Sequence, residues 1–392
     1  MAALTPGGIS PRPWIAVMDL SVTKNSPAGS CVLAEVMGLA DDYDITVFSD
    51  AFDNERPDRV KWVRIPLPKK PGVLRYVFFH LLAPVALRRH IRLRGRPPWL
   101  VQATQGQYVG ADICYAHFCH RAYLRDRWRL QNATGLRRLL RWLAYQYNAY
   151  FEARAFRRAR VVVAPSAGLV RELVDTYPFL QGRAYANPNP VDVAAYARPT
   201  DFDRAGQLHA LGLSTGHPVL CFAALGDFSR KGLALVLEAM AGLATASPSL
   251  VVVGGSPGEI DEYKRQTNAL GLQDRVAFTG FQRDVRPFFW AADLFVFPSS
   301  YETFALVVLQ AMAAGMPAIT TNLHGVEDYA IEGENAWIVE REVGTIRAAI
   351  QRVLDDPALL AQAAVAATRS VAAYDTPGFV GRWRDLLARF VA

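Results

Sequence analysis

Cysteine is scarce in this chain of 392 residues. The four cysteines, Cys31, Cys114, Cys119 and Cys221, include no Cys-x-x-Cys pair, which argues against a disulfide framework and a cysteine-rich zinc site. Charged residues make up only 20% of the chain and hydrophobic residues 51%. This composition is typical of globular proteins and excludes a mainly disordered chain. At about 150 residues per domain, the length predicts two or three domains.

Long hydrophobic runs are also missing. The longest apolar stretch, residues 73–87, is interrupted by Arg75 and His80 and is too short to span a bilayer. The first residues, MAALTPGGISPRPW, lack the apolar core that follows the basic start of a secretory signal. We therefore expect a cytoplasmic protein.

Several nucleotide-binding signatures are absent. The chain has no P-loop Gly-Lys-Ser/Thr and no Gly-x-Gly-x-x-Gly after its first predicted strand, which argues against a dinucleotide oxidoreductase. Two Asp-x-Asp triplets occur, at 42–44 and 201–203. Neither ends a predicted buried strand beside a phosphate site, so we expect no metal site there.

Short apolar runs alternate with segments of helical periodicity along the chain. The runs are β-like and bounded by polar turns, and they lie at 14–20, 44–50, 60–66, 99–105, 112–118, 160–166, 218–225, 249–255, 275–281, 293–299 and 317–322. Continuous Val, Ile and Phe runs suit strands buried on both faces of a parallel sheet, and the alternation implies βαβ units.

The alternation pauses at 190–216, a stretch rich in Pro, Asp, Gly and Ala. We take this stretch as an interdomain linker. The predicted fold class is α/β, with two doubly wound domains, 1–195 and 205–370, facing each other across a cleft. Residues 371–392 are expected to form a helix that crosses back to the first domain. Ligands of such sheets bind beyond the carboxyl ends of the strands.

The charge is divided unevenly between the two halves. Residues 1–190 carry a balance of +13, whereas residues 191–392 carry −6. The densest basic run, 88–96, directly follows the apolar segment FFHLLAPVAL. This pairing favours an anionic membrane surface as partner over nucleic acid, for which no recognition motif is present. A solvated basic helix is the alternative reading of the run.

The segment 299–317 carries the strongest chemical signal. A predicted buried strand ends at Pro298, a loop carries Glu302, and a helix is predicted from about Ala305. The free amides of a first helical turn bind phosphate without any side chain. A carboxylate is repelled by phosphate, so sugar hydroxyls are the expected partner of Glu302. Gln310 could bond a ribose if its side of the helix faces the cleft. The alternative is an ordinary amphipathic helix preceded by a solvent-facing Glu.

A second constellation, 225–233, reads LGDFSRKGL and follows the first strand of the second half. A helix is predicted to begin at about Lys231. Adjacent Arg230 and Lys231 at a strand–helix turn are suited to neutralise a diphosphate. A solvated loop is the alternative reading.

The run ETFALVVLQAMAAGMPA resembles the E-x7-E signature of retaining glycosyltransferase family 4, which has the GT-B fold and often reads EGFGLVVLEAMAAGLPV. The first Glu is kept as Glu302, and the second is replaced by Gln310. The resemblance implies that Glu302 lies by the donor sugar and Gln310 at the ribose. It also implies a set of residues around the donor: Thr303, Phe304, Ala305, Leu306 and Val307.

The form GDFxRKG resembles the lipopolysaccharide-core glucosyltransferases of this family. It implies that Arg230 and Lys231 bind the donor phosphates, with Gly226 in the same turn. By the same resemblance, Phe281 in TGF lies near the nucleotide base. Gly29 lies where the family has a Gly-Gly loop, and a plain helix N-terminus is the alternative there.

The segment 112–120, DICYAHFCH, resembles the ADVCYA segment of these core glucosyltransferases. The resemblance implies that His117 lies in the cleft, where it would bond the sugar or polarise the leaving group. A structural role for His117 is the alternative. We reject a metal cluster of His117 and His120 with the nearby cysteines, because most of these residues lie on one predicted strand and no second ligand group follows.

The predicted function is therefore hexose transfer, glucose favoured, from a nucleoside diphosphate sugar to a hydroxyl of a glycan or lipid-linked acceptor. The resemblance implies retention of configuration and no metal or other cofactor, with Glu302, His117, Lys231 and Arg230 as the catalytic set. We expect a role in lipopolysaccharide or polysaccharide synthesis at the inner face of the cytoplasmic membrane. The alternatives are a non-catalytic GT-B protein that binds membrane or a partner, and a GT-B sugar-nucleotide epimerase.

Overall fold

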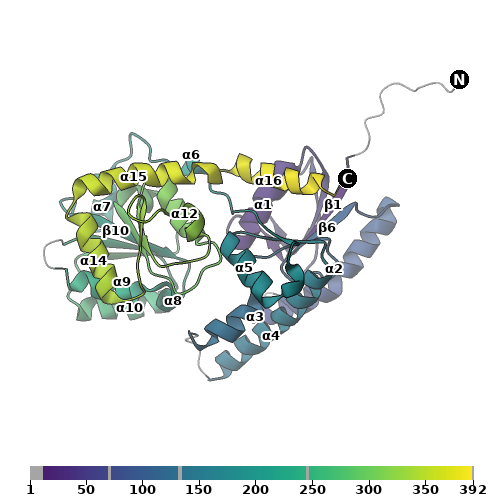
Figure 1. Ribbon diagram of the computed structural model, residues 1–392, viewed down its shortest axis with the longest axis horizontal. Helices are drawn as coiled ribbons and strands as arrows, with labels where there is room; N and C mark the ends of the chain where they lie inside the picture. The colour runs from purple at the N-terminus through teal and green to yellow at the C-terminus, as the bar shows by residue number, and fades with distance from the viewer. Residues whose placement is uncertain (1–11, 69–71, 131–134, 244–246, 391–392) are drawn as a thin grey trace.

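The computed structural model describes residues 12–68, 72–130, 135–243 and 247–390. The chain folds into two α/β domains that lie side by side (Figure 1). Each domain is built on its own sheet, and every strand pairing in both sheets is parallel. The predicted doubly wound fold class is confirmed.

The N-terminal sheet has seven strands. In spatial order they are β5 (Val60–Arg64), β3 (Asp44–Ser49), β1 (Trp14–Met18), β6 (Leu100–Thr104), β7 (Ile113–Tyr115), β8 (Val161–Ala164) and β9 (Ala184–Ala186). A separate pair joins β2 (Ser21–Val22) to β4 (Ala51–Phe52). Successive side chains of a strand point to opposite faces. Ala16 and Met18 of β1 accordingly enter one hydrophobic core, whereas Ile15 and Val17 enter another.

The helices of the N-terminal domain cover both faces of this sheet. They are α1 (Pro27–Leu39), α2 (Gly72–Arg94), α3 (His120–Ala122), α4 (Gly135–Arg158) and α5 (Ala167–Thr176), with a π-helical turn (Tyr123–Arg127) and 3-10 turns (Trp128–Leu130, Pro178–Leu180). The apolar stretch 73–87 lies within α2. Among the described residues, no helix combines the length and apolar character that crossing a bilayer requires.

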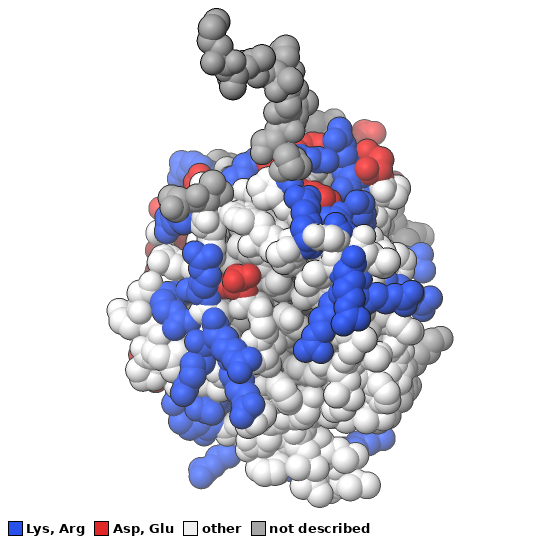
Figure 2. Space-filling view, turned by 90° about the vertical axis from the view of Figure 1, so that its right-hand side faces the viewer, with Lys and Arg blue, Asp and Glu red and all other residues white. Residues whose placement is uncertain are grey.

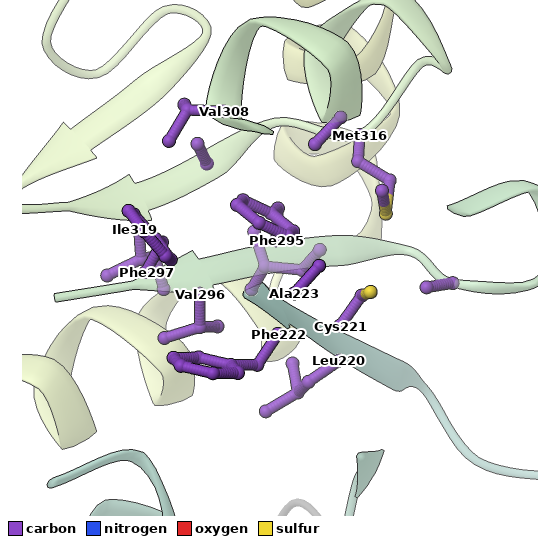
Figure 3. Close-up of a cluster of buried hydrophobic side chains, with 14 of the residues drawn as sticks. Leu220, Cys221, Phe222, Ala223, Phe295, Val296, Phe297, Val308, Met316 and Ile319 are labelled. Atoms are coloured by element: carbon purple, nitrogen blue, oxygen red, sulfur yellow. The ribbon is translucent and has the colours of Figure 1, made fainter. Parts of the chain in front are cut away.

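The C-terminal sheet has six strands. In spatial order they are β12 (Val276–Gly280), β11 (Ser249–Gly254), β10 (Val219–Ala224), β13 (Leu294–Phe297), β14 (Ala318–Thr320) and β15 (Ala336–Ile338). The central strands β11 and β13 are buried along their whole length, and β10 is buried at every residue but its last, so both of their faces lie in the core (Figure 3). Phe222 of β10 and Phe297 of β13 pack with their ring centroids 5.8 Å apart. The strand order reverses between β10 and β13.

The helices between and after these strands pack around this core. They are α6 (Val193–Tyr196) in the linker, then α7 (Arg204–Ala210), α8 (Phe228–Lys231), α9 (Leu233–Ala241), α10 (Pro257–Ala269), α11 (Arg286–Ala291), α12 (Leu306–Ala313), α13 (Val326–Tyr329), α14 (Val343–Leu354), α15 (Pro357–Val371), a 3-10 turn (Ala372–Tyr374) and α16 (Thr376–Ala388).

The last two helices run along one side of the molecule, and α16 lies on the N-terminal domain (Figure 1). Trp383 of α16 is fully buried, with its ring 5.2 Å from that of Tyr115 on β7. Arg384 Nε donates to Asp42 Oδ2 at 2.7 Å. Gly38 of α1 has no room for a Cβ, because that atom would lie 2.3 Å from a methyl group of Val380. Helix α16 therefore ties the end of the chain to α1.

One predicted helix start is wrong. Helix α8 is a single turn that ends at Lys231, because Gly232 has φ +88°, and α9 begins only at Leu233. Helix α12 begins at Leu306, within one residue of its predicted start, and Ala305 is its N-cap with φ +50°. The expected strand 112–118 is also shorter, so His117 lies in the segment after β7.

Candidate functional site

Two loops meet at the carboxyl edge of the C-terminal sheet. One follows β10 and leads into α8, and the other follows β13 and leads into α12. These are the two strands between which the sheet order reverses. A crevice at such a switch point is where open α/β sheets bind their ligands.

A cluster of charged side chains lies at this point. Lys231 Nζ forms an ion pair with Glu302 Oε1. Arg230 Nη1 lies 3.4 Å from the same oxygen and donates to the carbonyl of Tyr301 at 2.6 Å. Ser299 Oγ donates to Glu302 Oε1 at 2.8 Å. The structure thus brings together Arg230, Lys231 and Glu302, the charged residues that the sequence singles out.

The charges of this cluster balance one another. Asp227 Oδ2 accepts from Arg230 Nε at 2.7 Å, so two carboxylates face two cations. Burial lowers the pKa of Lys231, and the charge of Glu302 opposes that shift. Burial also disfavours charged Arg230, yet Glu302 and Asp227 raise the pKa of its guanidinium. An anionic ligand of Arg230 and Lys231 must therefore compete with Glu302 or Asp227.

Two backbone features shape the turn that carries the cations. A Cβ at Gly232 would lie 2.4 Å from the carbonyl oxygen of Pro298, so only glycine lets this turn approach the loop after β13. Glu259 accepts the amide of Asp227 at 2.7 Å and Ser256 Oγ at 2.8 Å. Sequence reasoning missed Glu259, although Ser256-x-x-Glu259 is the pattern of a capping box.

The start of α12 presents backbone amides at the same edge. The amides of Leu306 and Val307 belong to the first turn, where no earlier helical carbonyl can accept them. Phe304 is only 3% exposed and packs against Gly325, where a Cβ would lie 2.6 Å from the Phe304 backbone. Gln310 is half-buried one turn into the helix. This geometry suits an anion at the helix N-terminus.

A cavity of about 220 Å³ lies between the domains beside the charged cluster. Its walls come from both halves of the chain: Phe118, Tyr123, Arg141, Tyr145, Asp227, Arg230, Tyr301, Glu302 and Thr303. The aromatic residues of the N-terminal domain were not singled out by sequence, because no local pattern marks them. Two domains therefore contribute to one site.

Tyr301 and Thr303 connect the loop between β13 and α12 to the N-terminal domain. The Tyr301 hydroxyl donates to Glu172 Oε1 at 2.8 Å. Its ring lies 5.7 Å from that of Phe118. Ser166 Oγ, at the start of α5, donates to the carbonyl of Thr303 at 2.7 Å.

Three further predicted residues lie outside this cluster. Gly226 belongs to the loop after β10, and its Cβ would lie 3.2 Å from Glu259. Phe281 is 58% exposed after β12, two strands from β10. Gly29 lies in the first turn of α1, and its Cβ would collide with the carbonyl of Ser21 at 2.2 Å.

His117 follows β7, with its ring 4.1 Å from that of Tyr115. Burial lowers the pKa of His117 to about 3, so the ring is neutral at physiological pH. Its Nε2 is buried and has no hydrogen-bond partner among the described residues. A buried ring nitrogen without a partner can receive a ligand hydroxyl. In the described parts of the chain, no three His, Cys, Asp or Glu side chains are grouped as a metal ion requires.

Two family models match the chain. Residues 28–195 match "Glycosyltransferase Family 4" and residues 210–370 match "Glycosyl transferases group 1". The lipopolysaccharide core biosynthesis glycosyltransferase LpsE of Rhizobium meliloti is 34% identical over 137 residues, which are 34% of this chain and 39% of LpsE. LpsD of the same organism is 33% identical over 171 residues, 43% of this chain and 49% of LpsD. The chain thus matches less than half the length of either curated relative.

Solved structures share the fold over almost the whole chain. WaaG, a glycosyltransferase involved in lipopolysaccharide biosynthesis, has a TM-score of 0.75 at 18% identity and covers 95% of this chain and 99% of its own. Sucrose-phosphate synthase of Thermosynechococcus elongatus has a TM-score of 0.76 at 19% identity, covering 97% and 99%. Anabaena HepE, solved with UDP and glucose, has a TM-score of 0.69 at 18% identity, covering 96% and 100%. The architecture is that of the GT-B fold.

Proposed function

The chain belongs to the GT-B glycosyltransferases that these two family models describe, and we propose that it transfers a hexose from a nucleoside diphosphate sugar to an acceptor hydroxyl. The observation that carries this proposal is the cluster of Arg230, Lys231 and Glu302 beside the first-turn amides of α12. It lies at the switch point of the C-terminal sheet. Glucose as the sugar and UDP as the carrier are favoured by the likeness to HepE, which was solved with UDP and glucose.

Charge stabilisation of the leaving group is the proposed source of catalysis. Arg230, Lys231 and the amides of Leu306 and Val307 would hold the diphosphate as its negative charge develops. These groups would supply the positive charge that other enzymes take from a divalent metal, so we propose metal-independent transfer. Glu302 would exchange its contact with Lys231 for hydroxyls of the donor sugar.

We propose that the transfer retains configuration. The bond between the sugar C1 and the phosphate oxygen breaks, and the acceptor oxygen bonds to C1 on the same face. The acceptor proton passes to the leaving phosphate oxygen, so no side chain need act as a nucleophile. His117 Nε2, buried and without a partner among the described residues, would receive a hydroxyl of the donor sugar.

The surface of the N-terminal domain supports a membrane-associated acceptor. Basic side chains gather on the end of this domain, with few acidic ones among them (Figure 2). Leu136, Leu139, Leu140 and Leu143 of α4 are 70%, 51%, 55% and 49% exposed and repeat at helical spacing. An apolar stripe beside arginines favours the interface of an anionic bilayer. We propose a glycan or lipid-linked acceptor in lipopolysaccharide or polysaccharide synthesis at the cytoplasmic face of a membrane, in keeping with LpsE and LpsD.

One arginine of the basic run 88–96 contributes little to this surface, whereas Arg88, Arg89 and Arg92 are exposed. Arg94 is paired with Asp44 at 2.8 Å, its side chain is 12% exposed, and it stacks on Trp14. Arg94 therefore fixes the end of α2 to the sheet. Exposed apolar side chains lie on α2 as well, where Leu81, Val85 and Leu93 are 63%, 58% and 76% exposed, so both helices are candidates for lipid contact.

Calorimetric titration with UDP, GDP and their hexose derivatives, with and without magnesium, tests the donor site. We expect metal-independent binding that Lys231→Ala abolishes and that Lys264→Ala, a change of an exposed lysine on α10, leaves intact. No binding of any nucleotide at millimolar concentration would refute the transferase proposal.

Flotation with vesicles tests the membrane proposal. We expect binding to vesicles with anionic lipid and not to neutral ones, and its loss in a Leu136→Gln, Leu140→Gln double variant. A matched Val365→Gln variant, at a 69% exposed position on α15, should bind like the natural protein. Equal flotation of the double variant and the natural protein would exclude α4 as the docking element.

A further inference from the structure

A second cavity, of about 400 Å³, lies between α2 and α4 on the N-terminal domain. Its lining is mostly apolar and aromatic: Gly72, Val73, Tyr76, Phe118, His120, Ala144, Tyr145 and Asn148. The two helices pack together deeper in the domain, where the rings of His80 and Phe151 stack at 4.1 Å. Cavities lined by apolar groups with a few oriented polar ones are typical ligand sites.

His120 is the oriented polar group of this cavity. Its Nδ1 lies 2.7 Å from Glu152 Oε2, and the Glu152 side chain is fully buried. The same carboxylate accepts the His120 amide at 3.0 Å, Gln105 Nε2 at 3.0 Å and the Tyr177 hydroxyl at 2.8 Å. A buried carboxylate with four donors holds the imidazole in one orientation, as in a carboxylate–histidine pair.

This arrangement fixes the tautomer of His120. Glu152 serves as an acceptor for every other group that it contacts, so the proton of the neutral imidazole lies on Nδ1. The lone pair therefore lies on Nε2, the nitrogen that does not face Glu152. A hydroxyl in the cavity can donate to that lone pair.

The cavity adjoins both the donor cleft and the exposed apolar surface. Phe118 and Tyr145 line this cavity and the 220 Å³ cavity beside Arg230 and Glu302. On the outer side, Leu143 precedes the lining residue Ala144 on α4 and is 49% exposed. A molecule in this cavity would thus lie between the apolar surface of α4 and the charged cluster.

We propose that this cavity binds the acceptor, and that the acceptor is an amphiphile with an apolar chain beside its sugar. His120 Nε2 accepts a hydrogen bond from a sugar hydroxyl, while Val73, Tyr76 and Ala144 contact the apolar part. This inference rests on the proposed glycosyl transfer and assigns the acceptor side of that site to named residues.

The test is the binding of n-octyl β-D-glucoside, below its critical micelle concentration, by saturation-transfer NMR and calorimetry on the full chain. We expect Ala144→Phe, which fills the cavity, to weaken binding at least tenfold. Gln146→Phe adds the same ring at an exposed position of α4 outside the cavity and should leave the affinity within twofold.

His120→Phe keeps a ring in place and removes the accepting nitrogen, so about a fivefold loss of affinity is expected. Thermal melting checks that this variant folds, and Ala144→Phe carries the test if it does not. UDP affinity should stay unchanged in every variant, because the donor residues lie outside this cavity.

Four outcomes would overturn the proposal. One is that the protein binds UDP but does not bind the glucoside, which would support the donor site and refute the acceptor cavity. Another is unchanged affinity in Ala144→Phe. The third is a loss in Leu139→Gln but not in Ala144→Phe, which would place the glucoside on the exposed stripe of α4. If the protein binds the glucoside but not UDP, the proposed transfer reaction is refuted, and the cavity then has no acceptor role.

Discussion

The carboxylate of Glu302 is predicted to compete with the donor diphosphate for the cations of the site. This carboxylate is paired with Lys231, and Arg230 Nη1 lies 3.4 Å from its Oε1. Glu302→Gln keeps the size of the side chain and a hydrogen-bond acceptor for Ser299 while removing the charge. We expect this variant to bind UDP more tightly than the natural protein.

The magnitude follows from the geometry. Two unit charges 3.4 Å apart attract with about 5 kcal/mol at an effective dielectric constant of about 20. Most of this is offset by the desolvation of the paired groups and by water that replaces them. We therefore expect the binding free energy of UDP to improve by about 1.4 kcal/mol in Glu302→Gln, which corresponds to a tenfold lower Kd.

The assay is calorimetric titration of UDP at two salt concentrations. Glu238→Gln removes the same charge from an exposed position of α9 and serves as the matched control. The increase in UDP affinity should be smaller at high salt, and it should vanish when Lys231→Ala is added to Glu302→Gln. If Glu302→Gln instead weakens UDP binding tenfold while the control does not, the competition argument is wrong and Glu302 positions the phosphate ligands.

Three further predictions concern stability, each measured by thermal melting. Gly232→Ala should lower Tm by more than Gly333→Ala. Both glycines have positive φ, so alanine costs about 1–2 kcal/mol of stability at either position. Only at Gly232 would the new Cβ also collide with Pro298. Trp383→Ala empties a fully buried position between α16 and the N-terminal domain and should cost about 3–5 kcal/mol. Burial raises the pKa of Glu35 to about 8 from an ordinary 4.5. Between pH 4.5 and 8, Glu35 therefore keeps its proton in the folded chain and releases it in the unfolded chain, so the stability of the fold falls as pH rises through this range. Glu35→Gln should flatten this fall and raise Tm at pH 8.

The fold was predictable because its central strands are continuous apolar runs. Such runs are buried on both faces, and β10, β11 and β13 lie where the sequence places them. The strands at the far edges, β9 and β15, were missed. Strand β9 is half-buried to exposed, so it lacks the buried apolar run that marks the central strands. The break at Gly232 was missed because the left-handed conformation of a residue is decided by tertiary contacts.

The charged cluster of the candidate site was predictable because its residues lie in two short segments of the chain. Arg230, Lys231 and Glu302 follow neighbouring strands of one sheet, so sequence alone brings them to one edge. The partner of Glu302 was not predictable. A sugar hydroxyl is expected from the repulsion between carboxylate and phosphate, whereas the structure pairs Glu302 with Lys231. The hydrogen-bonded pair of His120 and Glu152 was also not predicted, because 32 residues separate the two in the sequence.

The loop that carries Glu302 belongs to one domain but is held by the other. The Tyr301 hydroxyl donates to Glu172, and Ser166 donates to the carbonyl of Thr303. Both contacts flank Glu302, so any separation of the domains removes the hydrogen bonds on either side of it. The position of Glu302, and with it the balance of charge at Arg230 and Lys231, therefore depends on closure of the interdomain cleft. Acceptor binding to the N-terminal domain and donor binding to the C-terminal domain would both favour the closed arrangement, and by linkage each would then increase the affinity for the other.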